Sequence, residues 1–189
     1  MIQPAQPAAP VSILTRGRVA QIACVTTDLA RTAADWSRLT GAGPFYCGKF
    51  FNAGNLYRGE SRDFWLDVAF GYLGDMQIQI AAPVDEGPSI YHEIIDRNGG
   101  GVGFHHTLVL TDDIAADKQR FAHMGVGIAA EVKLSGMHVV FFDTIDQLGF
   151  FVEYFQMSSY FDDFFVKAHR EHLAWDGADP VRHHPLGKA

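Results

Sequence analysis

The segment Phe104–Gly125, FHHTLVLTDDIAADKQRFAHMG, joins a strand pattern to a helix pattern across a single capping residue. Its first seven residues are apolar or β-branched apart from two histidines, which is typical of a buried strand. Asp113 is a suitable N-cap for the helix that follows, where Ile114 and Phe121 fall on one face, and Gly125 ends it. The segment therefore predicts the opening strand and helix of a β-α-β-β-β module.

The same order of elements occurs earlier in the chain. Val19–Thr26 (VAQIACVT) predicts a strand, Asp28 a cap, and the residues after it a helix that ends at Gly41. Asp28 coincides with Asp113 at a shift of 85 residues, and the ends of the two halves coincide at a shift of 74. Neither module would bury both faces of its sheet alone. We therefore expect an α+β fold in which two such modules form one cupped mixed sheet.

Turn residues between apolar runs divide the rest of the chain. Expected strands are 45–51, 64–72 and 76–82 in the first half and 127–132, 137–142 and 150–155 in the second, with a short helix at 89–97. An amphipathic helix is expected over 160–174, covering its own sheet or contacting a second subunit. We predict an N-terminal arm (1–16), a first module (17–83), a connector (84–103), a second module (104–156) and a C-terminal helix and tail (157–189).

Charge and cysteine content limit the classes of function. The net charge of −7 argues against nucleic acid or an anionic membrane as the main partner, since both need clustered Lys and Arg. No apolar run reaches the length of a membrane span, and the N-terminus lacks the features of a secretory signal. Cys24 and Cys47 form no disulfide framework and suggest buried thiols. These features together predict a cytoplasmic protein.

The repeat places four polar residues at equivalent positions inside apolar strands: Gln21, Gln79, His106 and Glu153. Burying such groups costs several kcal/mol unless they are paired, so we expect an inward-facing polar cluster. Imidazole and carboxylate are good ligands of divalent metals, and an amide oxygen is a weaker one. A metal site and a metal-free, hydrogen-bonded pocket both remain open. Strand alternation is expected to point His105 to the face opposite His106.

Three segments resemble a known family. GGGVGFHHTLVLTDDI (Gly99–Ile114), MQIQIAAP (Met76–Pro83) and FFDTIDQLGFFVEY (Phe141–Tyr154) resemble the vicinal oxygen chelate superfamily, which includes glyoxalases, bleomycin resistance proteins and extradiol dioxygenases. The resemblance extends over residues 18–156 and is greatest to the methylmalonyl-CoA epimerase-like branch. It implies a glyoxalase-like fold.

The resemblance also implies a metal site. The family carries its ligands on the first and last strands of each module, which here are the positions of Gln21, Gln79, His106 and Glu153. The expected cofactor is thus a divalent metal ion of unknown identity. Epimerases usually have His at the first of these positions. The Gln21 found here weakens a site for zinc, iron or cobalt and argues against extradiol dioxygenase chemistry, which needs two histidines.

The resemblance implies an isomerase, epimerase or lyase that acts on a carbonyl-containing molecule through a metal-stabilised enolate. Glu153 is the expected catalytic residue, whereas Glu60 and Glu93 lie in no recognisable motif. The substrate is expected to be a fairly bulky, hydrophobic small molecule such as an acyl thioester, and the protein is expected to be a homodimer. The alternatives are a metal-free small-molecule binding or resistance-type protein on the same fold, and a partner-binding protein that uses the aromatic tail.

Aromatic residues are unusually frequent, with 15 Phe, 3 Trp and 6 Tyr. Many of them fall on the predicted strands around the polar cluster, so they predict an apolar pocket. Packing between the sheet and its helices is the alternative explanation. The residues expected to line the substrate pocket are Phe51, Trp65, His138, Phe151 and Phe155.

Overall fold

The computed structural model describes residues 17–134, 136–157 and 159–183. The first module consists of β1 (Val19–Val25), α1 (Leu29–Thr40), β2 (Phe45–Asn52), β5 (Phe64–Leu73) and β6 (Met76–Pro83). The second consists of β7 (Gly103–Leu110), α3 (Ile114–His123), β8 (Ile128–Leu134), β9 (Met137–Phe142) and β10 (Phe151–Met157). The helix α2 (Ile90–Arg97) lies in the segment between the modules.

Capping residues close in sequence determine where α1 and α3 begin and where α1 ends. The Asp28 carboxylate accepts the backbone N–H of Arg31, and the Asp113 carboxylate accepts that of Ala116. Each bond satisfies a donor at a helix start that has no partner within the helix. Gly41 ends α1 in the left-handed conformation, which glycine adopts without steric cost.

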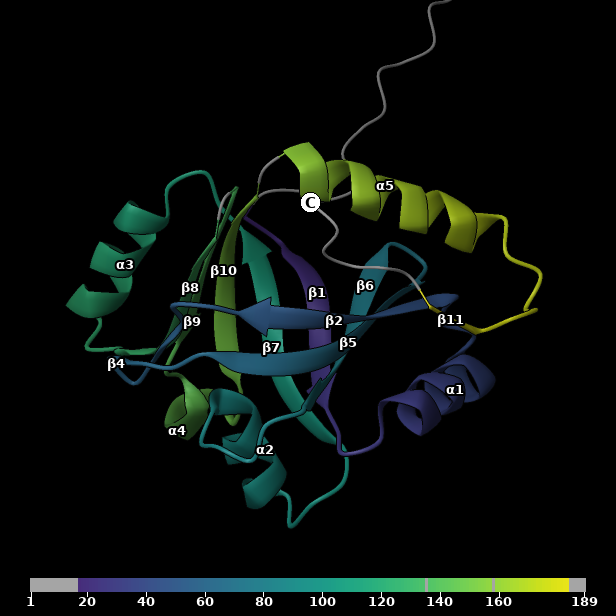
Figure 1. The fold of residues 1–189 in the computed structure, drawn as a ribbon. Coiled ribbons are helices and arrows are strands. Elements are labelled where there is room, and N and C mark those ends of the chain that lie inside the picture. The colour runs from purple at the N-terminus through teal and green to yellow at the C-terminus, as the bar shows by residue number, and fades with distance from the viewer. Residues whose placement is uncertain (1–16, 135, 158, 184–189) are drawn as a thin grey trace, which may run out of the picture.

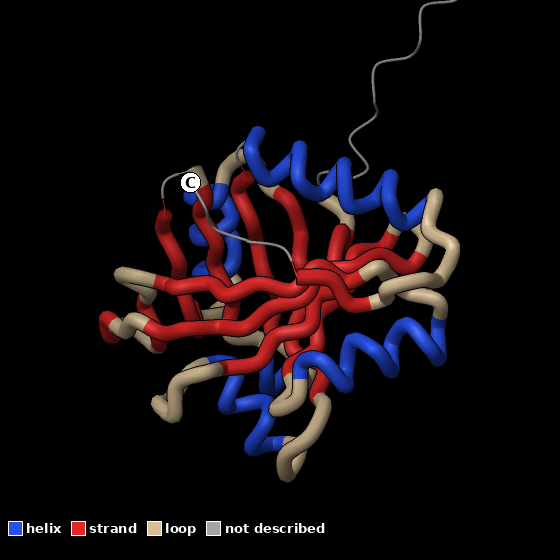
Figure 2. The backbone as a smooth tube through the Cα atoms, turned by 45° about the vertical axis from the view of Figure 1, so that its right-hand side comes forward, coloured by secondary structure: helices blue, strands red, loops and turns tan. Residues whose placement is uncertain are grey.

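All strands of the described residues belong to one curved sheet, in the order β11-β2-β5-β6-β1-β7-β10-β9-β8-β3-β4. Strand β1 pairs antiparallel with β7 at the centre and so joins the modules. Outside this pair, β6 runs parallel to β1 and β10 runs parallel to β7. The sheet wraps into a cup with the helices around it (Figures 1 and 2). The expected α+β fold of two modules forming a cupped mixed sheet is confirmed.

Four short elements were not expected from the sequence: β3 (Leu56–Tyr57), β4 (Glu60–Ser61), α4 (Ile145–Leu148) and β11 (Val181–His183). The β3–β4 hairpin belongs to the first module but pairs with β8 of the second. At the turn of this hairpin, Arg58 donates hydrogen bonds to Glu93 of α2 and to Asp143 after β9. The hairpin therefore links the rims of the two modules.

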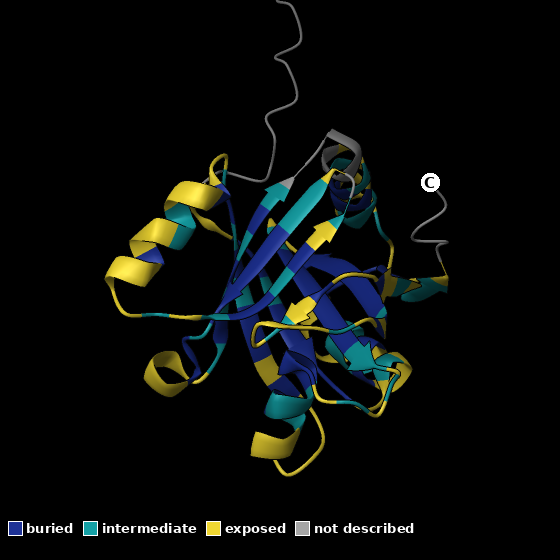
Figure 3. Cartoon of the chain, turned by 60° about the vertical axis from the view of Figure 1, so that its left-hand side comes forward, coloured by how far each residue is buried: buried dark blue, intermediate teal, exposed yellow. Residues whose placement is uncertain are grey.

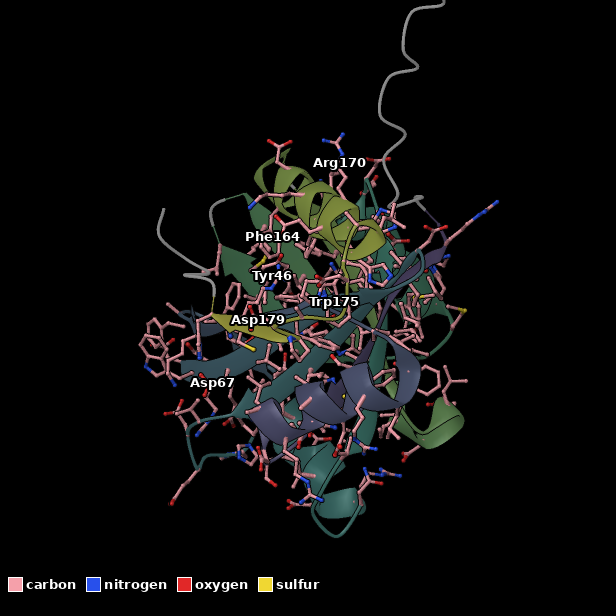
Figure 4. All side chains as sticks on the ribbon, turned by 90° about the vertical axis from the view of Figure 1, so that its right-hand side faces the viewer. Tyr46, Asp67, Phe164, Arg170, Trp175 and Asp179 are labelled. Atoms are coloured by element: carbon pink, nitrogen blue, oxygen red, sulfur yellow. The ribbon has the colours of Figure 1, made fainter. Side chains whose placement is uncertain are left out.

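The C-terminal helix α5 (Ser159–Leu173) lies across one end of the cup (Figure 1). Phe164 points from α5 toward Tyr46 on β2 (Figure 4), and Ala168 packs with Tyr46 and Tyr72. After the helix, β11 adds a parallel strand to β2. The described part of the tail thus covers its own sheet. The predicted arm 1–16 lies outside the described residues, as do the side chains at 160 and 161.

Burial follows this architecture. The inner parts of the strands are buried, whereas the outer surface of α3 is exposed (Figure 3). The outer surface of α1 is also largely exposed. The largest apolar cluster combines residues from both modules with Tyr91 of α2 and Phe165 of α5. Among the described residues, no helix is both long enough and apolar enough to cross a membrane.

Candidate functional site

The four central strands of the sheet bring the predicted polar residues together. His106 of β7 is fully buried, and its Nε2 lies 2.7 Å from Oε2 of Glu153 on β10 and 3.2 Å from Oε1 of Gln21 on β1. Gln79 of β6 lies on the strand beyond Gln21 and is also buried. Carboxylate, amide and imidazole groups at such distances form charge-assisted hydrogen bonds inside the protein.

Gln21, Gln79 and Glu153 face a cavity of about 90 Å³ between the sheet, α2 and α5. Its walls are mainly apolar, and α2 and α5 contribute one aromatic ring each to the lining. Such a chamber, with a few convergent polar groups, is the usual form of a small-molecule site. Its lining residues are Gln21, Phe50, Asn52, Leu66, Val68, Phe70, Gln79, Tyr91, Leu108, Val132, Met137, Val139, Phe141, Glu153, Phe155 and Phe165.

Further buried polar residues, on the side of Gln21 away from His106, hold its side-chain amide by hydrogen bonds. The Gln21 amide nitrogen donates to Oε1 of Gln77, and the Gln77 amide nitrogen donates to the hydroxyl of Tyr72 at 3.0 Å. Gln77 and Tyr72 are both almost completely buried. The signal for Gln77 was present in the sequence, because MQIQI alternates Gln with Ile and therefore puts Gln77 and Gln79 on one face.

The structure corrects the expected orientation of His105. Ala23 pairs with His106 and Cys24 pairs with Phe104, so His105 is the extra residue of a β-bulge. The bulge breaks the alternation, and Nδ1 of His105 lies 2.7 Å from Nδ1 of His106. Burial, and after it the neighbouring His106, hold the pKa of His105 well below its usual value. His105 is therefore a neutral partner of His106.

Tyr91 adds a donor that the sequence did not suggest. Its ring stacks on His105 with centroids 4.4 Å apart, and Tyr91 lines the cavity from α2. Burial raises the pKa of Tyr91 above its usual value, and the nearby Glu153 carboxylate raises it further. The phenol thus stays protonated and provides a hydrogen-bond donor at the cavity wall.

The two phenylalanines predicted beside Glu153 lie near the cluster in different ways. Phe155 lines the cavity. Phe151 is fully buried, with its ring 5.4 Å from that of His105, and supports the cluster outside the cavity wall.

Phe51, Trp65 and His138 were predicted to line the pocket, but the structure places them away from the cavity. Phe51 and Trp65 pair across β2 and β5 with ring centroids 4.8 Å apart, and each is 44% exposed. Their neighbours Phe50 and Leu66 face the cavity instead, because successive side chains on a strand point to opposite faces.

The same alternation explains His138. Met137 and Val139 line the cavity, so His138 points to the outer face of β9. There its Nε2 lies 2.7 Å from Glu131, which also accepts from Lys118. Burial acts to raise the pKa of the Glu131 carboxyl, but the hydrogen bonds from Lys118 and His138 hold it below its usual value.

Two other glutamates considered as bases lie outside the site. Glu93 is held by Arg58 and Tyr57, and Glu60 is exposed in the β3–β4 hairpin. Glu153 is the one carboxylate lining the cavity among the described residues.

The donor set differs from a zinc-type site. Within the described ranges, no three or more His, Cys, Asp or Glu side chains converge where they could hold a metal. Any cation at this cluster would therefore need the amide oxygens of Gln21 and Gln79 beside His106 and Glu153. One nitrogen ligand with several oxygen ligands suits a hard cation such as Mg²⁺ or Mn²⁺ better than Zn²⁺ or Cu²⁺.

Residues 20–141 match the family model of the glyoxalase/bleomycin resistance protein/dioxygenase superfamily. This match spans more than half of the chain. The chain belongs to this superfamily. The resemblance inferred from the sequence is thereby confirmed. Among curated proteins, none matches the chain.

Solved structures show the same fold at low sequence identity. Methylmalonyl-CoA epimerase from Mycobacterium tuberculosis is 17% identical, with a TM-score of 0.51, over 73% of this chain and 86% of that one. A variant of the Streptomyces coelicolor methylmalonyl-CoA epimerase in complex with 2-nitronate-propionyl-CoA is 19% identical, with a TM-score of 0.54, over 76% and 99%. A hypothetical protein from Bacillus halodurans C-125 is 16% identical, with a TM-score of 0.53, over 75% and 94%.

Proposed function

We propose that this superfamily member is an isomerase, epimerase or lyase that transfers a proton next to the carbonyl group of a largely apolar small molecule. The observation that carries the proposal is the buried Glu153, which faces an apolar cavity and is held by His106. Proton transfer at such a carbon requires a positioned base in a site shielded from water. Acyl thioesters, including those named in the similar structures, are one candidate class of substrate.

The residues present fit a hard divalent cation. Glu153 Oε2 and Gln21 Oε1 both lie within 3.2 Å of one nitrogen of His106. Neighbouring ligands of an octahedral ion bound at 2.0–2.1 Å lie roughly 3 Å apart, so each of the two oxygens already lies at a suitable distance from the nitrogen. We infer that Gln21, Gln79, His106 and Glu153 would hold the ion. When bound, such an ion supplies positive charge that stabilises a developing enolate oxygen.

The protein's own groups then have separate tasks. One carboxylate oxygen of Glu153 contacts His106, and the other is the atom that accepts the substrate proton. The protonated phenol of Tyr91 donates a hydrogen bond from the cavity wall, where it can orient a substrate oxygen. Phe70, Phe155 and Phe165 form apolar walls that exclude water and receive the hydrocarbon part of the substrate.

The test is exchange of the substrate proton with deuterium. Methylmalonyl-CoA and a 2-arylpropionyl thioester are incubated in D₂O with protein and Mg²⁺, and loss of the α-proton signal is followed by NMR. We expect the wild type to exchange at least one thioester and Glu153→Gln to slow this exchange by about 100-fold or more. Glu60→Gln, which changes an exposed glutamate outside the cavity, is the matched control and should keep the wild-type rate. A Glu153→Gln variant as fast as the wild type would contradict the role of Glu153.

A second candidate function is metal-free binding of a small molecule without turnover. It is favoured by the way the cluster satisfies itself, because both ring nitrogens of His106 and the amide nitrogen of Gln21 already have protein partners. In that case the same thioesters would raise the melting temperature without exchanging their α-protons. Exchange of the α-proton would rule this candidate out.

A further inference from the structure

A chain of buried hydrogen bonds runs from α5 to the candidate site. The Tyr72 hydroxyl donates to the backbone carbonyl of Phe165 at 3.3 Å, and the Gln77 amide nitrogen donates to the Tyr72 oxygen at 3.0 Å. Oε1 of Gln77 accepts from the amide nitrogen of Gln21, whose Oε1 faces Nε2 of His106. All four side chains are at most 2% exposed. We call Tyr72, Gln77 and Gln21 the amide relay.

The hydrogen bond of Tyr72 to Phe165 determines which atom donates in every other bond of the amide relay. A carbonyl oxygen can only accept, so the hydrogen of Tyr72 is committed to Phe165. The remaining neighbour of the Tyr72 oxygen must then be a donor, which fixes the amide nitrogen of Gln77 toward Tyr72 and its oxygen toward Gln21. That oxygen in turn requires the amide nitrogen of Gln21. The oxygen of Gln21 is left pointing into the site.

The orientation of Gln21 matters because one terminal atom of its amide, the oxygen, accepts hydrogen bonds, whereas the other, the nitrogen, donates them. With its oxygen inward, Gln21 presents an acceptor next to the carboxylate of Glu153, and the two oxygens share His106 Nε2. With its nitrogen inward, Gln21 would present a donor that competes with a cation or with the proton of His106. Rotating the buried amide of Gln21 would also break its hydrogen bond to Gln77. Water could not replace the lost partners, because no member of the relay is exposed.

We propose that Tyr72 and Gln77 are positioning residues, which hold the carbonyl oxygen of Gln21 toward the site and tie that orientation to the docking of α5. This inference rests on the proposed cation site for its functional consequence, although the orientation itself does not depend on any bound ion. Because α5 also provides Phe165 to the cavity wall, docking of this helix completes both the apolar wall and the orientation of Gln21.

The orientation is tested without metal by NMR on the full-length, ¹⁵N-labelled protein. The side-chain amide signals are assigned from their loss in Gln21→Glu and Gln77→Met. We expect the Gln21 amide protons to show nuclear Overhauser contacts to Gln77 and none to the ring of His106. In Tyr72→Phe, these protons should exchange with solvent about tenfold faster or more, because the acceptor that anchors the relay is gone.

Tyr46→Phe is the matched control. Tyr46 belongs to the same small cluster beneath α5 and loses the same atom, but it is not part of the relay. The amide protons of Gln21 should therefore exchange in Tyr46→Phe as they do in the wild type. Contacts between the Gln21 amide protons and the ring of His106 in the wild type would overturn the inference, as would equal acceleration in both tyrosine variants.

The consequence for the site is tested by Mn²⁺ binding in two backgrounds. Tyr72→Phe should weaken Mn²⁺ binding about tenfold, in the range typical of residues that orient metal ligands. In Gln21→Glu, both terminal atoms are oxygens and need no orientation, so adding Tyr72→Phe should then change the affinity less than about twofold. A merely structural loss would lower the affinity equally in both backgrounds and would contradict the positioning role. If the wild type binds no Mn²⁺ while the NMR contacts are as expected, the proposed cation site fails and the orientation stands.

Discussion

Replacing His105 by Phe should make the protein less stable at neutral pH and less sensitive to acid. The phenyl ring keeps the stack on Tyr91 and the contact with Phe151. The lost nitrogen leaves Nδ1 of the buried His106 without its partner, which costs about 1–3 kcal/mol.

The acid sensitivity follows from the low pKa of His105. Folded His105 stays neutral, whereas in the unfolded chain it takes up a proton as the pH falls below about 6.5. The unfolded state then binds more protons, so the free energy of unfolding falls as the pH falls. For this one group, the loss between pH 7.5 and 5.5 is about 1.4 kcal/mol. His105→Phe removes this contribution.

Urea denaturation followed by circular dichroism at pH 7.5, 6.5 and 5.5 measures the effect. We expect the free energies of the wild type and of His105→Phe to converge by about 1.4 kcal/mol as the pH is lowered over this range. Tyr91→Phe, which keeps His105 and the stacked ring, should lose stability as steeply as the wild type. Parallel curves for wild type and His105→Phe would refute the assignment of His105 as a buried neutral histidine.

Three further predictions concern the scaffold. Arg58→Met removes the ion pairs of the β3–β4 hairpin and should cost about 1 kcal/mol in urea denaturation, with the difference shrinking in high salt. Gly71→Ala places a Cβ 2.8 Å from the Phe45 ring and should cost about 1–3 kcal/mol by thermal unfolding; an unchanged melting temperature would contradict this. Burial raises the pKa of Cys24 and of Cys47 to about 11, so native protein at pH 8 should react with a disulfide reagent about 100-fold more slowly than protein in urea.

Much of the fold could be predicted because its signals are local. Asp28 and Asp113 cap their helices and Gly41 ends one of them, as their residue types suggest. The repeat also placed Gln21 and His106 on equivalent strands, because the shift of 85 residues that relates Asp28 to Asp113 relates these two residues as well. By contrast, β3 and β11 are too short to give a pattern and exist only because strands of other segments provide pairing partners.

The site was harder to predict where the sequence had to show which face of a strand a side chain occupies. Phe50 and Phe51 are the same residue type in adjacent positions, so the sequence alone does not show which faces the cavity. His105 was misplaced because alternation assumes a regular strand, and a bulge inserts one residue without any glycine or proline to mark it. Tyr91 comes from a connecting helix whose docking position depends on the whole cup.

If the polar cluster at the centre of the sheet is a cation site, it must bind Mn²⁺, which is measured by titrating the protein with Mn²⁺ and determining the free ion by electron paramagnetic resonance. We expect one bound Mn²⁺ per wild-type chain and an affinity at least about tenfold lower in Glu153→Gln, with Glu60→Gln unchanged. A wild-type protein that binds no Mn²⁺, or a Glu153→Gln variant that binds it equally well, would contradict the claim.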